Sequence, residues 1–239
     1  MALKEEILLA IYNEFTVWSQ KMESVCEKGC AACCTQNVTM TAVEGDLIHA
    51  HIREQGQEEW FAARLQQKGR MSQPQLTINQ FAARCLAGED VEPDRFGNLE
   101  PCPFLKDNCC LIYPVRPFSC RSFTSRSLCG PGVPAQVTDS YLSGVTAVLQ
   151  VIEHLGQGEY WGNMLDVLAA LSDLPENRGY VGLLPAAFAG LARANLVSAR
   201  PLPGFLIPEE EWAEVEPLLL GIFGHRIGEK TIEDILNNR

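Results

Sequence analysis

The sequence predicts a mainly α-helical fold with an irregular cysteine-rich knuckle and at most a short β-hairpin. Apolar residues recur at helical spacing in segments on both sides of the cysteines. The cysteine-rich stretches themselves show neither helical nor strand periodicity. The chain also lacks the series of strands alternating with helices that an α/β fold requires.

Length, charge and hydropathy exclude several classes of protein. The chain has 239 residues, enough to bury a core without disulfide staples, and a formal net charge of −11. A nucleic-acid surface needs a basic footprint, so we expect no nucleic-acid partner. No stretch approaches the ~18 consecutive apolar residues of a membrane span, so we expect no membrane partner. The acidic start lacks the apolar run of a secretory signal, and we expect a cytoplasmic protein.

Residues 3–23 are predicted to form an amphipathic helix. Its apolar residues recur at alternating steps of three and four, which places them on one stripe. The stripe consists of Leu8, Ile11, Phe15, Trp18 and Met22. We expect this stripe to pack on the core.

The first of two cysteine sets follows this helix. Its thiols are those of Cys26, Cys30, Cys33 and Cys34. In a reducing compartment, clustered cysteines are more often metal ligands than disulfides. A zinc knuckle usually takes two ligands from one short loop, whereas iron–sulfur loops often supply three or four. Neighbouring side chains of an extended segment point apart, so we expect Cys33 and Cys34 to serve two metals, or two irons of one cluster.

A capping box opens the next predicted helix. Thr41 and Glu44 have the required spacing, and the helix should run to about Gln55. Glu44 is either this cap or a metal ligand close to the cysteine loop, and the spacing favours the cap. His49 and His51 are two residues apart and share no helical face, so we interpret them as surface or packing residues.

Two further helices are expected before the second cysteine set, over residues 57–68 and 73–87. Pro74 lies near the start of the second of these. Cys85 falls in its last turn. It could reach a metal site or be an ordinary buried thiol, and the residues alone do not choose between these roles.

The second cysteine set begins about 70 residues after the first. It comprises Cys102, Cys109, Cys110, Cys120 and Cys129. Short apolar runs flank Lys106-Asp107-Asn108, a turn-forming set. We therefore expect a small hairpin that presents Cys102 and Cys110 on neighbouring arms.

Arginines stand beside these thiols at Arg116, Arg121 and Arg126. Their guanidinium groups could donate hydrogen bonds to sulfur or neutralise thiolate charge. Alternatively, they could bind backbone carbonyls and acidic neighbours. Both interpretations stay open.

The clearest break in composition is Gly130–Pro134. We place a boundary there, between a cysteine-cluster metal-binding domain (residues 1–134) and a helical C-terminal subdomain packed on it (residues 135–239). Helices are expected at 138–155, 159–171, 185–195, 208–222 and 230–238. This half contains no nucleophile–base pair, phosphate loop or HExxH motif, so we assign it to packing or to contact with a protein partner. Asp166 and His225 have no recognisable partner in the sequence.

Three runs of residues carry a resemblance to a known family. They are Cys26-x3-Cys30-x2-Cys33-Cys34, Cys102-Pro-Phe-Leu105, and Cys110-x-Ile112-Tyr113-x2-Arg116-Pro117-x2-Cys120-Arg121, with Cys129 trailing. Together they resemble the CxxCxxCC, or YkgJ-like, family of zinc- or iron-chelating domains over about residues 24–130. The first spacing is three where the family name has two. Cys85 fits an extra mid-chain cysteine of some members, and Cys109 falls outside the pattern.

The resemblance implies metal binding by nine thiols. They are Cys26, Cys30, Cys33, Cys34, Cys85, Cys102, Cys110, Cys120 and Cys129. We favour an iron–sulfur cluster as the cofactor because of the tight loop and the adjacent pair Cys33-Cys34. Zinc or iron ions stay the alternative, because both metals accept thiolates.

Two other functions are kept as alternatives, and whether the chain is an enzyme stays open. One branch of the family resembles flagellin lysine N-methylases, which implies a metal-dependent protein-modifying enzyme. The spacing of Cys26, Cys30 and Cys33 is also that of a radical-type loop, but the strands of the usual barrel are missing from the pattern. The second alternative is a thiol redox or metal-delivery protein, for which Cys109 is the candidate thiol.

Overall fold

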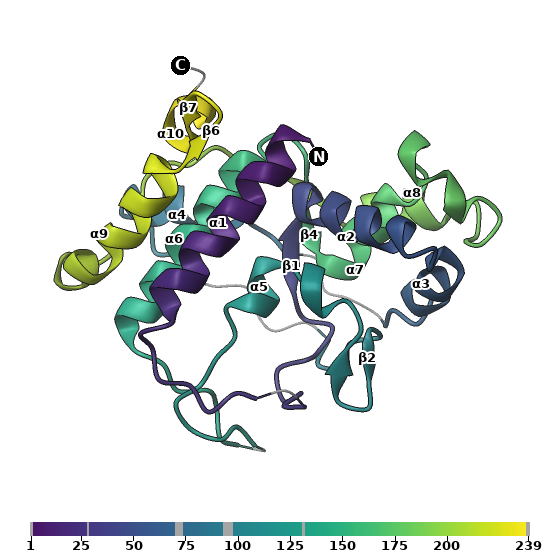
Figure 1. Cartoon of the computed structure of the whole chain (residues 1–239), viewed down its shortest axis with the longest axis horizontal. Coiled ribbons are helices and arrows are strands. Elements are labelled where there is room, and N and C mark those ends of the chain that lie inside the picture. The colour runs from purple at the N-terminus through teal and green to yellow at the C-terminus, as the bar shows by residue number, and fades with distance from the viewer. Residues whose placement is uncertain (1, 28, 70–73, 93–97, 131, 238–239) are drawn as a thin grey trace.

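The computed structural model describes residues 2–27, 29–69, 74–92, 98–130 and 132–237. The mainly α fold is confirmed. The elements form two groups of helices with the cysteine-bearing loops gathered at one end of the molecule (Figure 1).

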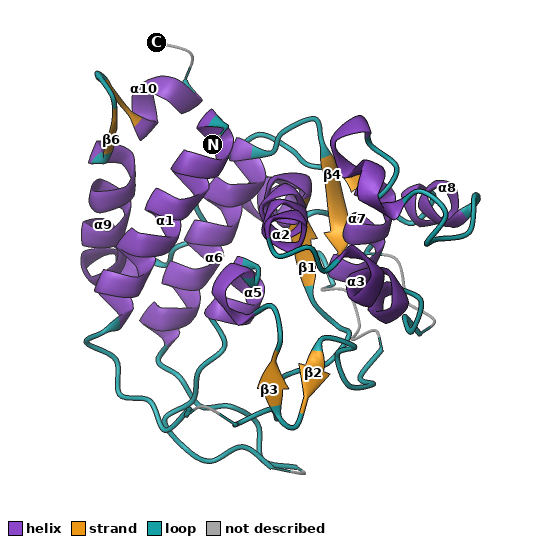
Figure 2. Cartoon of the chain, turned by 45° about the vertical axis from the view of Figure 1, so that its right-hand side comes forward, coloured by secondary structure: helices purple, strands orange, loops and turns teal. Residues whose placement is uncertain are grey.

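The first group of helices packs around α1 (Leu3–Ser19). This helix lies against α6 (Asp139–Leu155) and α9 (Glu209–Gly224), as Figure 2 shows. The predicted stripe faces inward: Leu8, Ile11, Phe15 and Trp18 are buried, and Met22 packs against the core from the loop beyond the helix. The helix ends at Ser19, earlier than the predicted residue 23.

The second group is built on α2 (Ala42–Glu54), which packs against α7 (Met164–Leu171) and α3 (Glu58–Leu65). The predicted capping box is confirmed, because the Thr41 side chain accepts from the Glu44 backbone N–H and the Glu44 carboxylate accepts from the Thr41 N–H. Helix α8 (Phe188–Arg193) covers the outer side of α7.

A three-stranded antiparallel sheet lies between the helices and was not predicted. Its order is β1 (Thr39–Thr41), β4 (Tyr160–Asn163) and β5 (Val197–Ser198). The predicted helix 159–171 is therefore wrong at its start, where β4 pairs with β1. Asn163 ends the strand and caps α7, since its side chain accepts from the Leu165 N–H at 3.0 Å.

The predicted hairpin is confirmed by β2 (Leu105–Lys106) and β3 (Cys109–Cys110). Asp107 and Asn108 both have positive φ, 49° and 60°, as a two-residue type I′ turn requires. The remaining elements are α4 (Ile78–Leu86), the 3₁₀ helices η1 (Tyr113–Val115) and η2 (Pro175–Tyr180), α5 (Phe118–Arg121), β6 (Arg226–Ile227), β7 (Lys230–Thr231) and α10 (Ile232–Leu236).

Several predicted boundaries need correction. Helix α4 begins at Ile78, and its cap is Thr77 with Gln80 rather than a turn that starts at Pro74. The predicted helix 230–238 begins as a strand pair and becomes α10 at Ile232. Residues 73 and 238, at the ends of two predicted helices, lie outside the described residues.

Asp166 and His225, which had no recognisable partner in the sequence, have partners in the fold. The Asp166 carboxylate accepts from Lys68 and from Asn195. The His225 ring contacts the Glu14 carboxylate at 2.9 Å.

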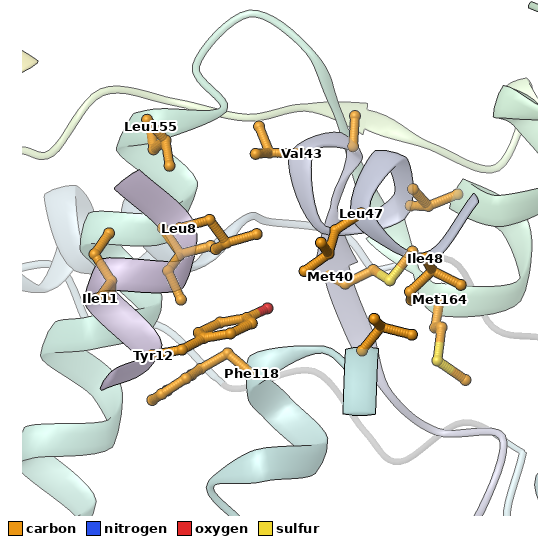
Figure 3. Close-up of a cluster of buried hydrophobic side chains, with 14 of the residues drawn as sticks. Leu8, Ile11, Tyr12, Met40, Val43, Leu47, Ile48, Phe118, Leu155 and Met164 are labelled. Atoms are coloured by element: carbon orange, nitrogen blue, oxygen red, sulfur yellow. The ribbon is translucent and has the colours of Figure 1, made fainter. Parts of the chain in front are cut away.

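One large cluster of buried apolar residues forms the core, and its members come from both sides of residue 134. Figure 3 shows part of it, where Tyr12 of α1 lies against Phe118 of α5, facing Met40 and Leu47. The division at residue 134 stays a prediction. Among the described residues, no helix is both long enough and apolar enough to cross a bilayer.

His49 gives the fold a specific acid sensitivity. The ring is fully buried; its Nε2–H donates to the Leu168 carbonyl at 2.9 Å, so Nδ1 accepts from the Tyr180 hydroxyl at 3.1 Å. Burial lowers the pKa of His49 from 6.5 to about 4. The unfolded chain therefore binds the extra proton first, and stability is lost as the pH falls from 6.5 towards 4. We expect a loss of about 2 kcal/mol between pH 7 and 5 from this residue.

Urea unfolding at pH 7 and pH 5 measures this loss. His49→Gln should lose about 2 kcal/mol less than the wild type over this interval, whereas His51→Gln should follow the wild type. Equal pH dependence in His49→Gln and wild type would contradict the assignment.

Candidate metal centre

Main-chain hydrogen bonds bring the two cysteine sets together. The Cys102 N–H donates to the Cys34 carbonyl at 3.0 Å, and the Gln36 N–H donates to the Glu100 carbonyl at 2.9 Å. Between them, Thr35 and Pro101 form an isolated antiparallel bridge. The loop of the first set is thereby aligned along the strand-like segment that leads to the second set.

Apolar residues of the second set anchor it on the helical core. Phe104, Ile112 and Phe118 are at most 2% exposed. The Phe104 ring stacks on Phe61 of α3, with centroids 5.1 Å apart and an interplanar angle of 6°. The cysteines that flank these anchors, Cys102, Cys110 and Cys120, are partly buried against the same core.

Five thiols from three segments gather in this place, and we call them the inner thiols. They are Cys33, Cys34, Cys102, Cys110 and Cys120. Each is close enough to others of the group for charge on one to raise or lower the pKa of another. The inner thiols combine members of both cysteine sets.

Burial dominates the electrostatics of three of these thiols, Cys102, Cys110 and Cys120. It raises the pKa of Cys102 to about 11 and raises the pKa of Cys120 still further, with a smaller contribution from neighbouring cysteines. Free thiolates of Cys102, Cys110 and Cys120 are therefore disfavoured. A bound cation would reverse this preference, because it stabilises the deprotonated ligand.

The expectation that Cys33 and Cys34 point apart is wrong. Their side chains hydrogen-bond to each other, which lowers the pKa of Cys34 and raises that of Cys33. The reason is a tight turn, closed by the Cys34 N–H on the Ala31 carbonyl at 3.0 Å, where the expectation assumed an extended segment.

The arginines hydrogen-bond to backbone carbonyls and acidic neighbours. Arg116 donates to the Tyr113 carbonyl, Arg121 donates to the Arg116 and Pro114 carbonyls, and Arg126 pairs with Glu23. The Arg116 guanidinium still lies near the inner thiols, since it lowers the pKa of both Cys110 and Cys120. The positive charge of Arg116 favours the thiolate forms of Cys110 and Cys120, and this effect does not require a hydrogen bond to sulfur.

Three predicted ligands lie in the loops around this group. Cys26 and Cys30 are exposed, and Cys129 is half-buried. The Val25 N–H donates to the Ser125 carbonyl at 2.9 Å, and Thr124 donates to the Ser24 hydroxyl at 2.7 Å. The segment that leads to Cys26 therefore runs beside the segment that leads to Cys129.

Cys85 and Cys109 are placed differently from the other cysteines. Cys85 is half-buried in the last turn of α4. Cys109 is half-buried on β3, opposite Lys106 and next to Cys110. Within the described part of the chain, the main influences on the pKa of the inner thiols come from neither of them.

The inner thiols do not form a closed coordination shell. Within the described ranges, no three Cys, His, Asp or Glu side chains are close enough together to hold a metal ion. Both zinc and iron accept thiolate ligands. The donor set therefore fits either metal.

Two residues near this site were missed by the sequence analysis. The Tyr12 hydroxyl lies close enough to Cys120 for charge on this thiol to raise the pKa of Tyr12, and Phe118 belongs to the apolar core against which Cys120 packs. A tyrosine within an apolar helical stripe is a weak signal for such a role. Phe118 lies inside the Arg-Pro-x-x-Cys run, which is a stronger one.

The sequence around these thiols resembles a family of metal-chelating domains. Residues 25–140 match the CxxCxxCC family model, described as a "Putative zinc- or iron-chelating domain". The match confirms the resemblance inferred from the cysteine spacing and supports metal binding in general, for zinc or iron alike. No curated protein and no solved structure matched the chain in the other two comparisons.

Proposed function

We propose that residues 25–140 bind an iron–sulfur cluster through cysteine thiolates, with zinc or iron ions as the alternative, in a cytoplasmic protein. The observation that carries the proposal is the gathering of the five inner thiols from both cysteine sets, three of which, Cys102, Cys110 and Cys120, pack against the apolar core. Five thiols exceed the four ligands of one tetrahedral zinc ion. A loop that supplies several thiolates is typical of iron–sulfur sites.

The inner thiols are the primary ligand candidates in this proposal. Cys34, Cys102, Cys110 and Cys120 carry the strongest support, because they come from three segments that the backbone holds together. Cys33 is a neighbour that could replace or supplement one of them. Cys26, Cys30 and Cys129 are proposed to close the exposed side, and Cys85 stays a predicted ligand.

The apolar and the charged residues around the thiols play different roles in this proposal. Phe104, Ile112 and Phe118 exclude water from the buried side. Arg116 offsets part of the negative charge that several thiolates would gather. When bound, an iron–sulfur cluster would supply one-electron chemistry, whereas zinc would serve as a structural or transferable ion.

The C-terminal half has no assigned chemistry. We propose that it supports the cysteine half and offers contact to a protein partner. Exposed apolar side chains such as Val181, Leu191 and Leu220 support such a contact.

The test is elemental analysis and an absorption spectrum on full-length protein purified without oxygen. We expect brown protein with several irons and acid-labile sulfides per chain. Colourless protein with one or two zinc ions would select the alternative. Protein that contains neither metal and gains neither on incubation with iron, sulfide or zinc would contradict the proposal.

Metal removal should destabilise the whole chain. A ligand that binds only the folded state at a free concentration 1,000 times its Kd contributes about 4 kcal/mol. We therefore expect chelation to lower the melting temperature clearly, as followed by far-ultraviolet circular dichroism. An unchanged melting temperature after verified metal loss would contradict a site that is coupled to folding.

A further inference from the structure

The carboxylate of Glu44 lies where three elements meet, and one of them, α5, carries Cys120. Glu44 is 2% exposed. Its Oε1 accepts from the Tyr12 hydroxyl of α1 at 2.9 Å and from the Phe118 N–H of α5 at 2.7 Å. Its Oε2 accepts from the N–H and the hydroxyl of Thr41, at 2.9 and 3.1 Å. Glu44 therefore connects α1, the start of α2 and α5.

These four hydrogen bonds exclude Glu44 as a metal ligand in this conformation. An ionised carboxylate offers about four lone-pair sites, and all of them are used. Of these four bonds, only the one from the Thr41 N–H belongs to the capping box. The bonds to Tyr12 and Phe118 go beyond what the cap of α2 requires.

The second pair of bonds acts on the segment that carries Cys120. Phe118 is the first residue of α5, two residues before Cys120. Arg121, one residue after it, lies over the Tyr12 ring at 4.4 Å and donates to the carbonyls of Pro114 and Arg116. Ser119 donates to the Thr39 carbonyl at 2.8 Å. The short helix is thus held on both sides of its cysteine.

We propose that Glu44 is a positioning residue for the metal centre, which holds the Cys120 thiol in place through the Phe118 N–H and the Tyr12 hydroxyl. The inference rests on the function proposed above. Groups that orient metal ligands typically contribute 10- to 100-fold to metal affinity. Because Glu44 acts through the backbone of α5, we expect the lower end of that range.

The test uses Co²⁺ as a spectroscopic probe in the reduced full-length chain, freed of metal and titrated without oxygen. Thiolate-to-cobalt charge-transfer absorption reports sulfur ligation directly. Glu44→Gln keeps the volume of the side chain but removes its charge and one acceptor oxygen. We expect about tenfold weaker Co²⁺ binding and a weaker or shifted charge-transfer band.

Glu153→Gln is the matched control. Glu153 is also fully buried and also accepts two backbone N–H groups, from Asn79 at 2.8 Å and Arg200 at 2.7 Å. It lies on α6, and its two backbone partners belong to α4 and to the segment before α9 rather than to α5, which carries Cys120. Its replacement should lower thermal stability but leave the cobalt affinity and band unchanged.

The outcomes distinguish the proposal of metal binding by the thiols from the proposal that Glu44 positions Cys120. Wild-type binding with thiolate bands, lost in part only in Glu44→Gln, supports both. An unchanged band and affinity in Glu44→Gln, or the same change in Glu153→Gln, overturns the positioning role and leaves metal binding intact. Absence of any thiolate band in the wild type overturns both.

A second pair of variants decides the question if Glu44→Gln fails to fold. Tyr12→Phe removes one hydroxyl that donates to Glu44, and Tyr180→Phe removes one that donates to His49. Both tyrosines are buried. Weaker cobalt binding in Tyr12→Phe but not in Tyr180→Phe supports the role, and equal binding in both overturns it.

Discussion

Cys110→Ser is expected to lower metal affinity by more than about 100-fold, whereas Cys109→Ser should leave it unchanged. Loss of a direct ligand should exceed the 10- to 100-fold cost that is typical of supporting residues. Cys110 belongs to the inner thiols, while its neighbour Cys109 pairs with Lys106 across the hairpin. Adjacent side chains of a strand point to opposite faces, so the two thiols cannot serve the same centre equally.

These two variants control for each other because each removes one thiol from the same strand. The measurement is metal content per chain after purification without oxygen, followed by competition with a chelator. Equal loss in both variants would point to damage of the hairpin rather than to ligation. Full retention of metal by Cys110→Ser would remove it from the ligand set.

Phe104→Ala is expected to cost about 3–5 kcal/mol of folding stability and to weaken metal binding at the same time. The Phe104 side chain is fully buried and stacks on Phe61, so truncation leaves a cavity between the cysteine hairpin and α3. Cys102 lies two residues away and should lose its fixed position. The effect on binding follows from the packing, since Phe104 itself offers no ligand.

Urea unfolding and metal titration of the same preparations measure the two effects. Phe123→Ala is the control, because Phe123 is 47% exposed and lies in the same half of the chain. It should change the free energy of unfolding by about 0.5 kcal/mol or less. A loss below about 1 kcal/mol in Phe104→Ala would show that Phe104 does not anchor the hairpin.

The helices with strong apolar periodicity could be predicted from the sequence, and the short strands could not. Helix α1 presents its stripe as expected, and the Thr41–Glu44 spacing gave the start of α2 correctly. In contrast, β4 covers only Tyr160–Asn163, too short for a period of two to be distinguished from the helix that follows. Its pairing with β1 depends on residues more than a hundred positions away.

For the candidate site, the residue types were predictable and their grouping was not. The spacing of Cys110 and Cys120 carried the resemblance to the family whose model matches residues 25–140, but the contact between Cys34 and Cys102 rests on a long-range backbone hydrogen bond. The side-chain directions of Cys33 and Cys34 were misjudged because a turn replaces the assumed extended segment. Local pattern cannot reveal such non-local pairing, since loop closure leaves no periodic signal.

The packing of Phe118 has a consequence for how this motif can be transferred between proteins. Its ring contacts Phe15, with centroids 4.7 Å apart, and Tyr12, both from α1, and α2 packs against α7. Both α1 and α7 lie outside residues 25–140. Grafting the cysteine motif alone into another scaffold would expose these apolar faces to water. A portable unit would have to include the two helices that contribute no thiol.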